Sequence, residues 1–265
     1  MFRTLPLSVS LAGVDLSSDP QAVGVATGVR GLLEWLSAGQ VRAVTLDAAA
    51  PGLRARELSR SARRDLAATL RRLELAPGGL DLWIPPSHFA DPARQDRAIS
   101  ATVGALELAS ELRALAGAGA AVVTVELANE TDAGVVRTLA AASERTGAAL
   151  ADTAWPVREG IAAPDAGGAL APSLDPASVL LAGADPVGEA GRLGGVLAGA
   201  RLNDLSGSGR VEPGSSGGRL DVASYHGALA AGGYEGFVTL DLRHLREPTR
   251  AIENTQERWT RLPGS

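Results

Sequence analysis

Short apolar runs with a two-residue period alternate along the whole chain with longer segments of helical period. Alternation of this kind predicts parallel strands joined by crossover helices. Eight strands are expected, the number that a closed (β/α)₈ barrel requires. They cover Leu7–Ala12, Val41–Asp47, Leu80–Pro85, Ala121–Leu127, Ala148–Thr153, Ala169–Asp175, Ala200–Asp204 and Phe237–Arg243. We therefore expect an α/β fold, a (β/α)₈ TIM barrel that forms a single domain over residues 1–265.

Helix starts and loops support this interpretation. Asp91-Pro92, Asp175-Pro176 and Asp185-Pro186 each combine an N-cap residue with Pro at the first helical position. Pro156–Gly168 shows no clear helix, so an irregular connection is expected between the fifth and sixth strands. The Gly- and Ser-rich residues 207–218 fall in the loop after the seventh strand. An open doubly wound sheet is the alternative, but the sequence has no early Gly-rich dinucleotide turn.

The alternation within each strand predicts which side chains face the barrel lumen. In the last strand, Val238 and Leu240 belong to the helix layer, so Thr239, Asp241 and Arg243 point inward. The fifth strand is ambiguous, because Asp152 has the opposite parity to its neighbours. For the other strands the expected inward residues include Thr45, Asp47, Asp81, Trp83, Thr124, Glu126, Ser173, Asp175, Arg201 and Asn203.

Carboxylates therefore lie near the carboxyl ends of several strands, where barrel enzymes build their sites. Such a ring repels itself unless a cation, shared protons or hydrogen-bond donors compensate it. A divalent metal is one answer, and Arg201 with Arg243 is another.

Composition removes several classes of function. The 265 residues include no Cys, and every one of the 25 basic residues is Arg. Thiolate chemistry and lysine Schiff bases are therefore excluded. The net charge of −5 argues against a nucleic-acid partner. No apolar run is long enough to span a membrane, and we expect a cytoplasmic protein.

Several segments together resemble a known family. They are RRDLAATLRRLEL at Arg63–Leu75, GLDLWIPPSHFADPARQDRA at Gly79–Ala98, LDPASVLLAG at Leu174–Gly183, ARLNDLSGSG at Ala200–Gly209 and GGRLDVASYHGALAAGGYEGFVTLDLR at Gly217–Arg243. In this order and spacing the chain resembles the sugar phosphate isomerase/epimerase family of xylose isomerase-like TIM barrels. The resemblance implies a small-molecule carbohydrate as partner.

The resemblance also implies one divalent metal (Mn, Mg, Co or Zn), held at the ends of strands five to eight by residues of which two also move protons. Carried over, the strand-five, strand-six and strand-eight positions hold Asp152, Asp175 and Asp241, with Asp175 and Asp241 as the catalytic candidates. At strand seven the family's His-x-x-Asp pattern reads Arg201-Leu202-Asn203-Asp204. A guanidinium has no lone pair for a metal. A retained metal site would therefore need Asp204 or His244, and a barrel without metal is the equal alternative.

Further residues are candidates for substrate binding. Arg201 and Arg243 could hold an anionic group or pair with the aspartates, and His88 lies just past the third strand. Trp83 and Trp155 could stack on a sugar or simply fill the core. The sequence pattern at Asp175 is the same whether this residue is a helix N-cap before Pro176 or a metal ligand.

Two hypotheses follow. The first is a sugar or sugar-derivative isomerase/epimerase that transfers protons next to a carbonyl. The second is a catalytically degenerate barrel that binds a ligand or a partner, with Arg201 in place of the metal. A DNA-repair endonuclease is poorly supported, because that chemistry uses a histidine-rich metal site and the chain has three His.

Overall fold

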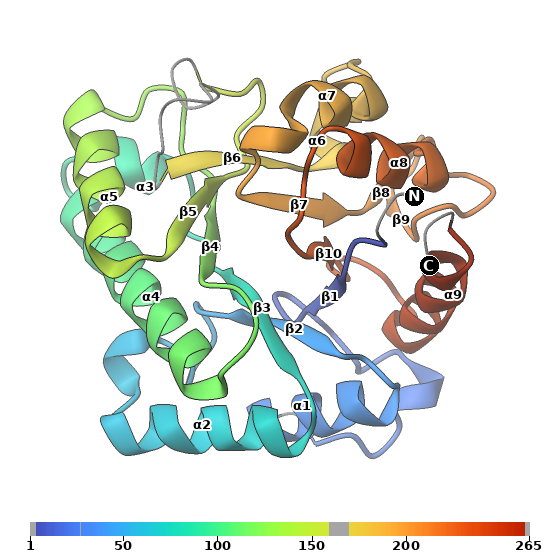
Figure 1. The fold of residues 1–265 in the computed structure, drawn as a ribbon, viewed down its shortest axis with the longest axis horizontal. Coiled ribbons are helices and arrows are strands. Elements are labelled where there is room, and N and C mark those ends of the chain that lie inside the picture. Colours follow the sequence, from blue (N-terminus) through green and yellow to red (C-terminus); the bar gives the residue numbers. More distant parts are fainter. Residues whose placement is uncertain (1–3, 27, 159–169, 263–265) are drawn as a thin grey trace.

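A closed barrel of parallel strands forms the centre of the protein (Figure 1). The computed structural model describes residues 4–26, 28–158 and 170–262. Within this part, eight strands close in the order β1-β10-β7-β6-β5-β4-β3-β2, each parallel to its neighbours. They are β1 (Leu7–Ser10), β2 (Ala43–Asp47), β3 (Ala76–Asp81), β4 (Val122–Val125), β5 (Ala149–Asp152), β6 (Leu170–Leu174), β7 (Gly199–Leu202) and β10 (Val238–Leu240). The expected (β/α)₈ barrel is confirmed.

Helices surround the barrel in Figure 1. They are α1 (Val29–Ala38), α2 (Arg60–Arg72), α3 (Ser87–Ala90), α4 (Gln95–Ala116), α5 (Ala133–Thr146), α6 (Pro176–Leu181), α7 (Pro186–Leu193), α8 (Val222–Ala231) and α9 (Pro248–Thr260), with 3₁₀ turns at Pro20–Ala22, Ala55–Glu57 and Gly194–Val196. The Gly- and Ser-rich loop includes a hairpin of β8 (Asp204–Ser206) and β9 (Gly209–Val211). Most of the segment expected to be irregular, residues 159–168 of Pro156–Gly168, lies outside the described residues.

Two of the three expected helix starts are confirmed. Asp175 and Asp185 cap α6 and α7 with Pro in the first turn. The start at Asp91-Pro92 is wrong. Asp91 closes the short helix α3, its carboxylate accepts a hydrogen bond from the backbone N–H of Ala93, and α4 begins only at Gln95.

The third strand begins four residues earlier than expected. Pro77, Gly78 and Gly79 lie before the expected strand Leu80–Pro85, yet they belong to β3. Position 78 has no room for a side chain because the backbone approaches Ser8 closely across the lumen. A Cβ on Gly78 would lie 2.3 Å from the Ser8 hydroxyl. Gly79, with φ of 140°, adopts a backbone conformation that favours glycine.

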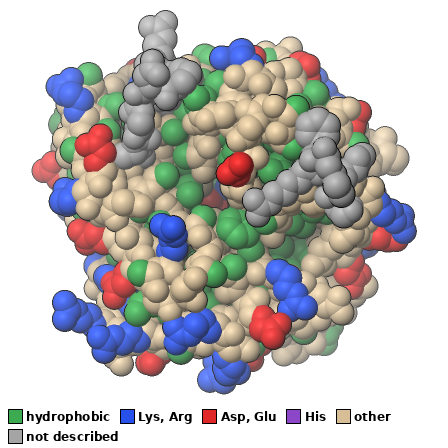
Figure 2. Space-filling view, in the orientation of Figure 1, with side chains coloured by type: hydrophobic (Ala, Val, Ile, Leu, Met, Phe, Trp, Pro, Cys, Tyr) green, Lys and Arg blue, Asp and Glu red, His purple; other side chains and the backbone are tan. Residues whose placement is uncertain are grey.

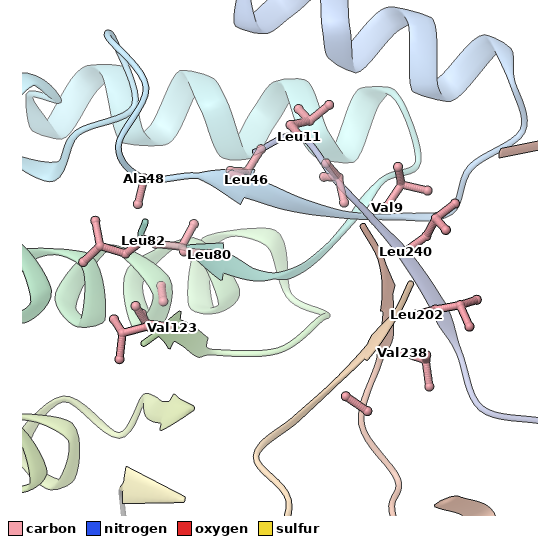
Figure 3. Close-up of a cluster of buried hydrophobic side chains, with 14 of the residues drawn as sticks. Val9, Leu11, Leu46, Ala48, Leu80, Leu82, Val123, Leu202, Val238 and Leu240 are labelled. Atoms are coloured by element: carbon pink, nitrogen blue, oxygen red, sulfur yellow. The ribbon is translucent and has the colours of Figure 1, made fainter. Parts of the chain in front are cut away.

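Apolar side chains of alternate strand residues pack between the barrel and its helices. Figure 3 shows Val9, Leu46, Leu80, Val238 and Leu240 in this layer, and all are at most 2% exposed. Close packing of this layer is the main source of the fold's stability.

Ser8, Thr45 and Thr239 are small, polar inward residues. Ser8 and Thr45 hydroxyls lie 2.9 Å apart, and the hydroxyls of Thr45 and Thr239 lie 3.4 Å apart. The strand parity inferred from the sequence is thus correct for β2 and β10. Among the described helices, none is long and apolar enough to cross a membrane.

Candidate functional site

The carboxyl ends of four barrel strands and the β8–β9 hairpin bring six charged side chains together. Asp81 ends β3, Arg201 lies in β7, and Asp175 and Asp241 follow β6 and β10 directly. We call the six the arginine–aspartate group; they are Asp81, Asp175, Asp241, Arg201, Arg210 and Arg243. This is the end of the barrel where (β/α)₈ enzymes carry their sites.

Arg201 lies at the centre of this group, with only 2% of its surface exposed. Its NH1 and NH2 donate to the two carboxylate oxygens of Asp81 at 2.8 and 3.3 Å. NH2 also lies 3.2 Å from Oδ2 of Asp241. Burial alone would lower the pKa of Arg201, but Asp81 and Asp241 raise it above its ordinary value. The guanidinium is therefore permanently charged and fixed in position.

Asp241 is held by three guanidinium groups. Its Oδ2 lies 3.2 Å from Arg201, 3.1 Å from Arg210 and 2.5 Å from Arg243. Burial alone would raise the pKa of Asp241, but the neighbouring arginines, Arg201 foremost, hold it well below its usual range. An aspartate with such a low proton affinity is a poor base near neutral pH.

Arg210 bridges the two aspartates that were expected to hold a metal. From the β9 strand of the hairpin, its NH1 donates to Asp241 at 3.1 Å and its NH2 donates to Asp175 at 3.2 Å. The side-chain amide of Asn203 donates to Asp175 at 3.0 Å and lies 3.5 Å from Oδ2 of Asp241. Donors of hydrogen bonds thus occupy the space between these carboxylates.

Asp175 also caps α6. Its Oδ1 accepts the backbone N–H of Ser178 at 3.2 Å, and Oδ1 of Asn203 accepts that of Ala177 at 2.9 Å. Of the two interpretations offered by the sequence, helix cap and metal ligand, the structure shows the helix cap, and Asp175 is also ion-paired with Arg210.

The other expected metal ligands lie apart from this bridge. The carboxylate of Asp152 accepts backbone N–H groups of Leu127 and Ala154, both at 3.0 Å. Burial raises the pKa of Asp152 even though these bonds lower it. His244 is exposed and its backbone is left-handed, with φ of 68°.

Asp204 organises the loop that carries Arg210. It is fully buried, and its Oδ1 accepts N–H groups of Leu205, Arg219 and Leu220 at 2.7 to 2.9 Å, while Oδ2 accepts that of Gly214 at 3.3 Å. Four backbone donors leave this carboxylate little capacity for a metal.

The residues present do not fit the divalent metal that the resemblance implies. Over the described residues, no three acidic or His side chains converge on a common point that could hold a metal ion. Guanidinium and amide donors face the carboxylates of Asp175 and Asp241, and a metal needs lone pairs there.

The expected substrate-binding residues divide into two places. Trp83 lies against the arginine–aspartate group. Arg243 stacks on its ring with Cζ 3.8 Å from the ring centre, and Cζ of Arg201 lies 5.1 Å from the same centre. Trp155 follows β5 and packs half-buried against the core. His88 lies away from the group on α3, where its Nε2 is 2.8 Å from Arg94 NH1.

The sequence did not predict the part that two residues, Arg210 and Glu126, take in the site. Arg210 lies in the Gly- and Ser-rich loop, and only the hairpin pairing of β8 with β9 explains how it reaches Asp175 and Asp241. Glu126 follows β4 and is exposed. Loss of hydration, then repulsion from Asp175 and Asp152, raises its pKa. Strand parity in the sequence had already predicted that Glu126 points inward.

Comparison with known proteins rests on structure alone. No family model and no curated protein sequence matches the chain. Solved structures do match over nearly the whole chain. A xylose isomerase domain protein from Planctomyces limnophilus has 14% identity and a TM-score of 0.63, covering 98% of this chain and 97% of that one.

Two further structures add to the comparison. A D-psicose 3-epimerase crystallised in the presence of D-fructose has 11% identity and a TM-score of 0.71, covering 98% of this chain and 100% of that one. A xylose isomerase-like TIM barrel protein from Mycobacterium smegmatis in complex with magnesium has 12% identity and a TM-score of 0.66, covering 98% of each chain. The chain therefore has the fold of the xylose isomerase-like TIM barrels, as its sequence resemblance implied.

Proposed function

We propose that this chain is a carbohydrate-binding barrel of the sugar-modifying type in which guanidinium groups replace the divalent cation. One observation carries the proposal: Arg210 donates to both Asp175 and Asp241, the aspartates at two of the expected metal positions. Arg201 adds a second cation beside Asp241. The positive charge that a metal would supply is thus already built into the chain.

The charge of the group indicates the kind of ligand. Its three arginines balance its three aspartates, so neither an anion nor a cation is favoured by net charge. A neutral polyhydroxylated molecule suits such a site, because guanidinium N–H groups donate to hydroxyl and carbonyl oxygens. The half-buried Trp155 supplies aromatic surface for the apolar face of a sugar, whereas Arg243 already stacks on the ring of Trp83.

Proton transfer next to a carbonyl is the second candidate, and Glu126 favours it. This carboxylate is exposed at the strand ends and its pKa is raised, as a general acid or base requires. Asp175 and Asp241 are engaged by arginines, so their role in this chemistry would be to position groups rather than to move protons. Arg210 or Arg243 would then polarise the carbonyl oxygen.

Ligand binding in the presence of a chelator tests the proposal. The protein in EDTA is titrated with a panel of ketoses and aldoses, with thermal unfolding and calorimetry as readouts. We expect saturable stabilisation by at least one sugar, weakened about tenfold in Arg243→Ala, the loss for one charge-assisted contact. Arg137→Ala, an exposed arginine on α5, is the matched control.

Three results decide between the alternatives. Binding that appears only after a divalent metal is added would overturn the replacement of the metal. Binding without exchange of substrate carbon-bound hydrogen in D₂O would leave the binding function and remove proton transfer. Exchange that is lost in Glu126→Gln while binding persists would assign the proton transfer to Glu126.

A further inference from the structure

A small cavity lies inside the barrel, next to Arg201. Its volume is about 40 Å³, and the hydroxyl-bearing residues Thr45, Thr124, Ser173 and Thr239 line it together with Arg201. One water molecule needs about 10–15 Å³ of such space, so the cavity has room for about three. We infer that this cavity binds ordered water molecules, and that one of them completes the hydrogen bonding of Arg201. We refer to it as the lumen cavity.

The lumen cavity extends towards the amino ends of the strands. Val122 and Gly199, the first residues of β4 and β7, line it, as does Phe237 just before β10. The arginine–aspartate group lies at the other end, where the carboxyl ends of the strands meet. Arg201 belongs to both, so its side chain separates the lumen cavity from the candidate site.

Small polar residues make this part of the lumen different from that of most (β/α)₈ barrels. Such barrels usually fill the lumen with bulky branched side chains such as Val, Ile and Leu. Here a Cβ on Gly199 would lie 2.8 Å from the hydroxyl of Ser173, and a Cβ on Gly78 would lie 2.3 Å from that of Ser8. The hydroxyl groups therefore exclude larger residues at these two positions. Dry cavities in proteins are apolar, and a cavity lined by hydroxyls is suited to water.

Two buried polar atoms of the lining need a partner. Nε of Arg201 and Oγ of Ser173 have no hydrogen-bond partner among the described residues, although the two residues are only 2% and 5% exposed. NH1 and NH2 of Arg201 both donate to Asp81, so Nε is the guanidinium nitrogen that lacks an acceptor. A buried donor on a charged group is costly without a partner, and internal water commonly supplies one.

The charges around Arg201 favour a neutral occupant over an anion. Asp81 and Asp241 already compensate the guanidinium, and Arg201 is the one charged side chain among the described residues that line the lumen cavity. On the face shown in Figure 2, charged side chains of both signs are spread around the edge, so this face adds no field that favours an anion. Water can accept from Nε–H and also exchange hydrogen bonds with the hydroxyl groups.

Bound water gives Arg201 a second point of attachment. Asp81 holds the guanidinium through NH1 and NH2, and water in the lumen cavity holds it through Nε. The water site is thus a positioning element for the cation at the centre of the arginine–aspartate group. It takes no carbohydrate, so this inference stands or fails independently of the proposed sugar binding.

A high-resolution crystal structure of the intact protein, grown with sodium bromide as the salt, tests the inference directly. We expect electron density for water within about 2.7–3.2 Å of Nε of Arg201 and no anomalous signal from bromide there. A bromide signal at this position would overturn the neutral occupant. Absence of any density beside Nε would overturn the site itself.

Two variants of the lining locate the water. Ser173→Val replaces a hydroxyl with methyl groups that occupy part of the lumen cavity, and the water beside Nε should be lost. Thr124→Val keeps the shape of the side chain and removes its hydroxyl, and the water should be less well occupied. It also serves as the test if Ser173→Val does not fold. Thr102→Val is the matched control, because the buried hydroxyl of Thr102 donates to the carbonyl of Ala98 within α4.

A measurement in solution complements the crystal structures. The Nε–H signal of Arg201 is followed in ¹⁵N-resolved NMR spectra for a nuclear Overhauser effect at the water frequency. We expect this effect in the wild type and in Thr102→Val, and a clear loss of intensity in Ser173→Val or Thr124→Val. Its absence from the wild type, or equal intensity in the wild type and both variants of the lining, would overturn the inference.

Discussion

Arg201 and Asp81 form a two-point ion pair across the inside of the barrel. The NH1–Oδ1 and NH2–Oδ2 distances are 2.8 and 3.3 Å, and the side chains are 2% and 0% exposed. The residues come from β7 and β3, which are not neighbours in the sheet. Ser10 completes the environment of Asp81 with a hydroxyl hydrogen bond of 2.5 Å. A pair so placed fixes the guanidinium that the site is built around.

Breaking this ion pair should lower the free energy of unfolding. Asp81→Asn leaves the buried charge of Arg201 with less compensation, and we expect a loss of about 3–5 kcal/mol in the free energy of unfolding. Urea unfolding at neutral pH measures it. Asp47→Asn is the matched control, because Asp47 ends the adjacent strand β2 and is only partly buried. A loss below about 1 kcal/mol for Asp81→Asn, the level of an exposed ion pair, would contradict the account.

Asp241 should make the protein sensitive to acid. Its pKa in the folded protein lies well below its ordinary value, which in an unfolded chain is about 3.9. Its contribution to stability is therefore complete above about pH 4 and is lost as the pH falls through the folded pKa. We expect a carboxyl NMR titration to find Asp241 still ionised at pH 3. Protonation near pH 4 would contradict this expectation.

Glu126 should show the opposite behaviour. Because its folded pKa is raised, its stabilising contribution is present below the unfolded pKa of about 4.3 and is lost as the pH rises through the folded pKa. Glu126→Gln should therefore gain stability relative to the wild type as the pH rises from 4 to 7. Urea unfolding at both pH values tests this. A stability difference between Glu126→Gln and the wild type that is the same at pH 4 and pH 7 would contradict this expectation.

Asp204 should be structural and not a metal ligand. Asp204→Ala removes an acceptor from four backbone N–H groups of the loop that carries Arg210. We expect a loss of at least about 2 kcal/mol in the free energy of unfolding, since buried donors are left without a partner. The loss should be the same with and without Mn²⁺. A loss that appears only with Mn²⁺ would show Asp204 to be a ligand.

Much of the fold follows from local patterns. The two-residue period of apolar positions predicted all eight barrel strands. The same alternation predicted that Asp81, Thr239 and Asp241 point inward. Two errors had different causes. The third strand was expected to begin at Leu80, yet Gly78 belongs to β3, where it makes room for Ser8. Asp91 closes one helix instead of starting the next.

The candidate site was predictable only in part. Strand parity identified Arg201 as the neighbour of the aspartates, because both lie on regular strands. Arg210 comes from a hairpin in a Gly- and Ser-rich loop, and no periodicity specifies where such a loop returns.

Titration with divalent metals tests the central claim most directly. Thermal unfolding of the purified, EDTA-treated protein is followed with Mn²⁺, Mg²⁺, Co²⁺ and Zn²⁺, alongside Arg210→Ala, Arg201→His and the double variant. The account predicts no saturable stabilisation of the wild type, because guanidinium groups neutralise Asp175 and Asp241, and stabilisation that first appears in the double variant. Saturable stabilisation of the wild type that is abolished by Asp241→Ala would contradict it.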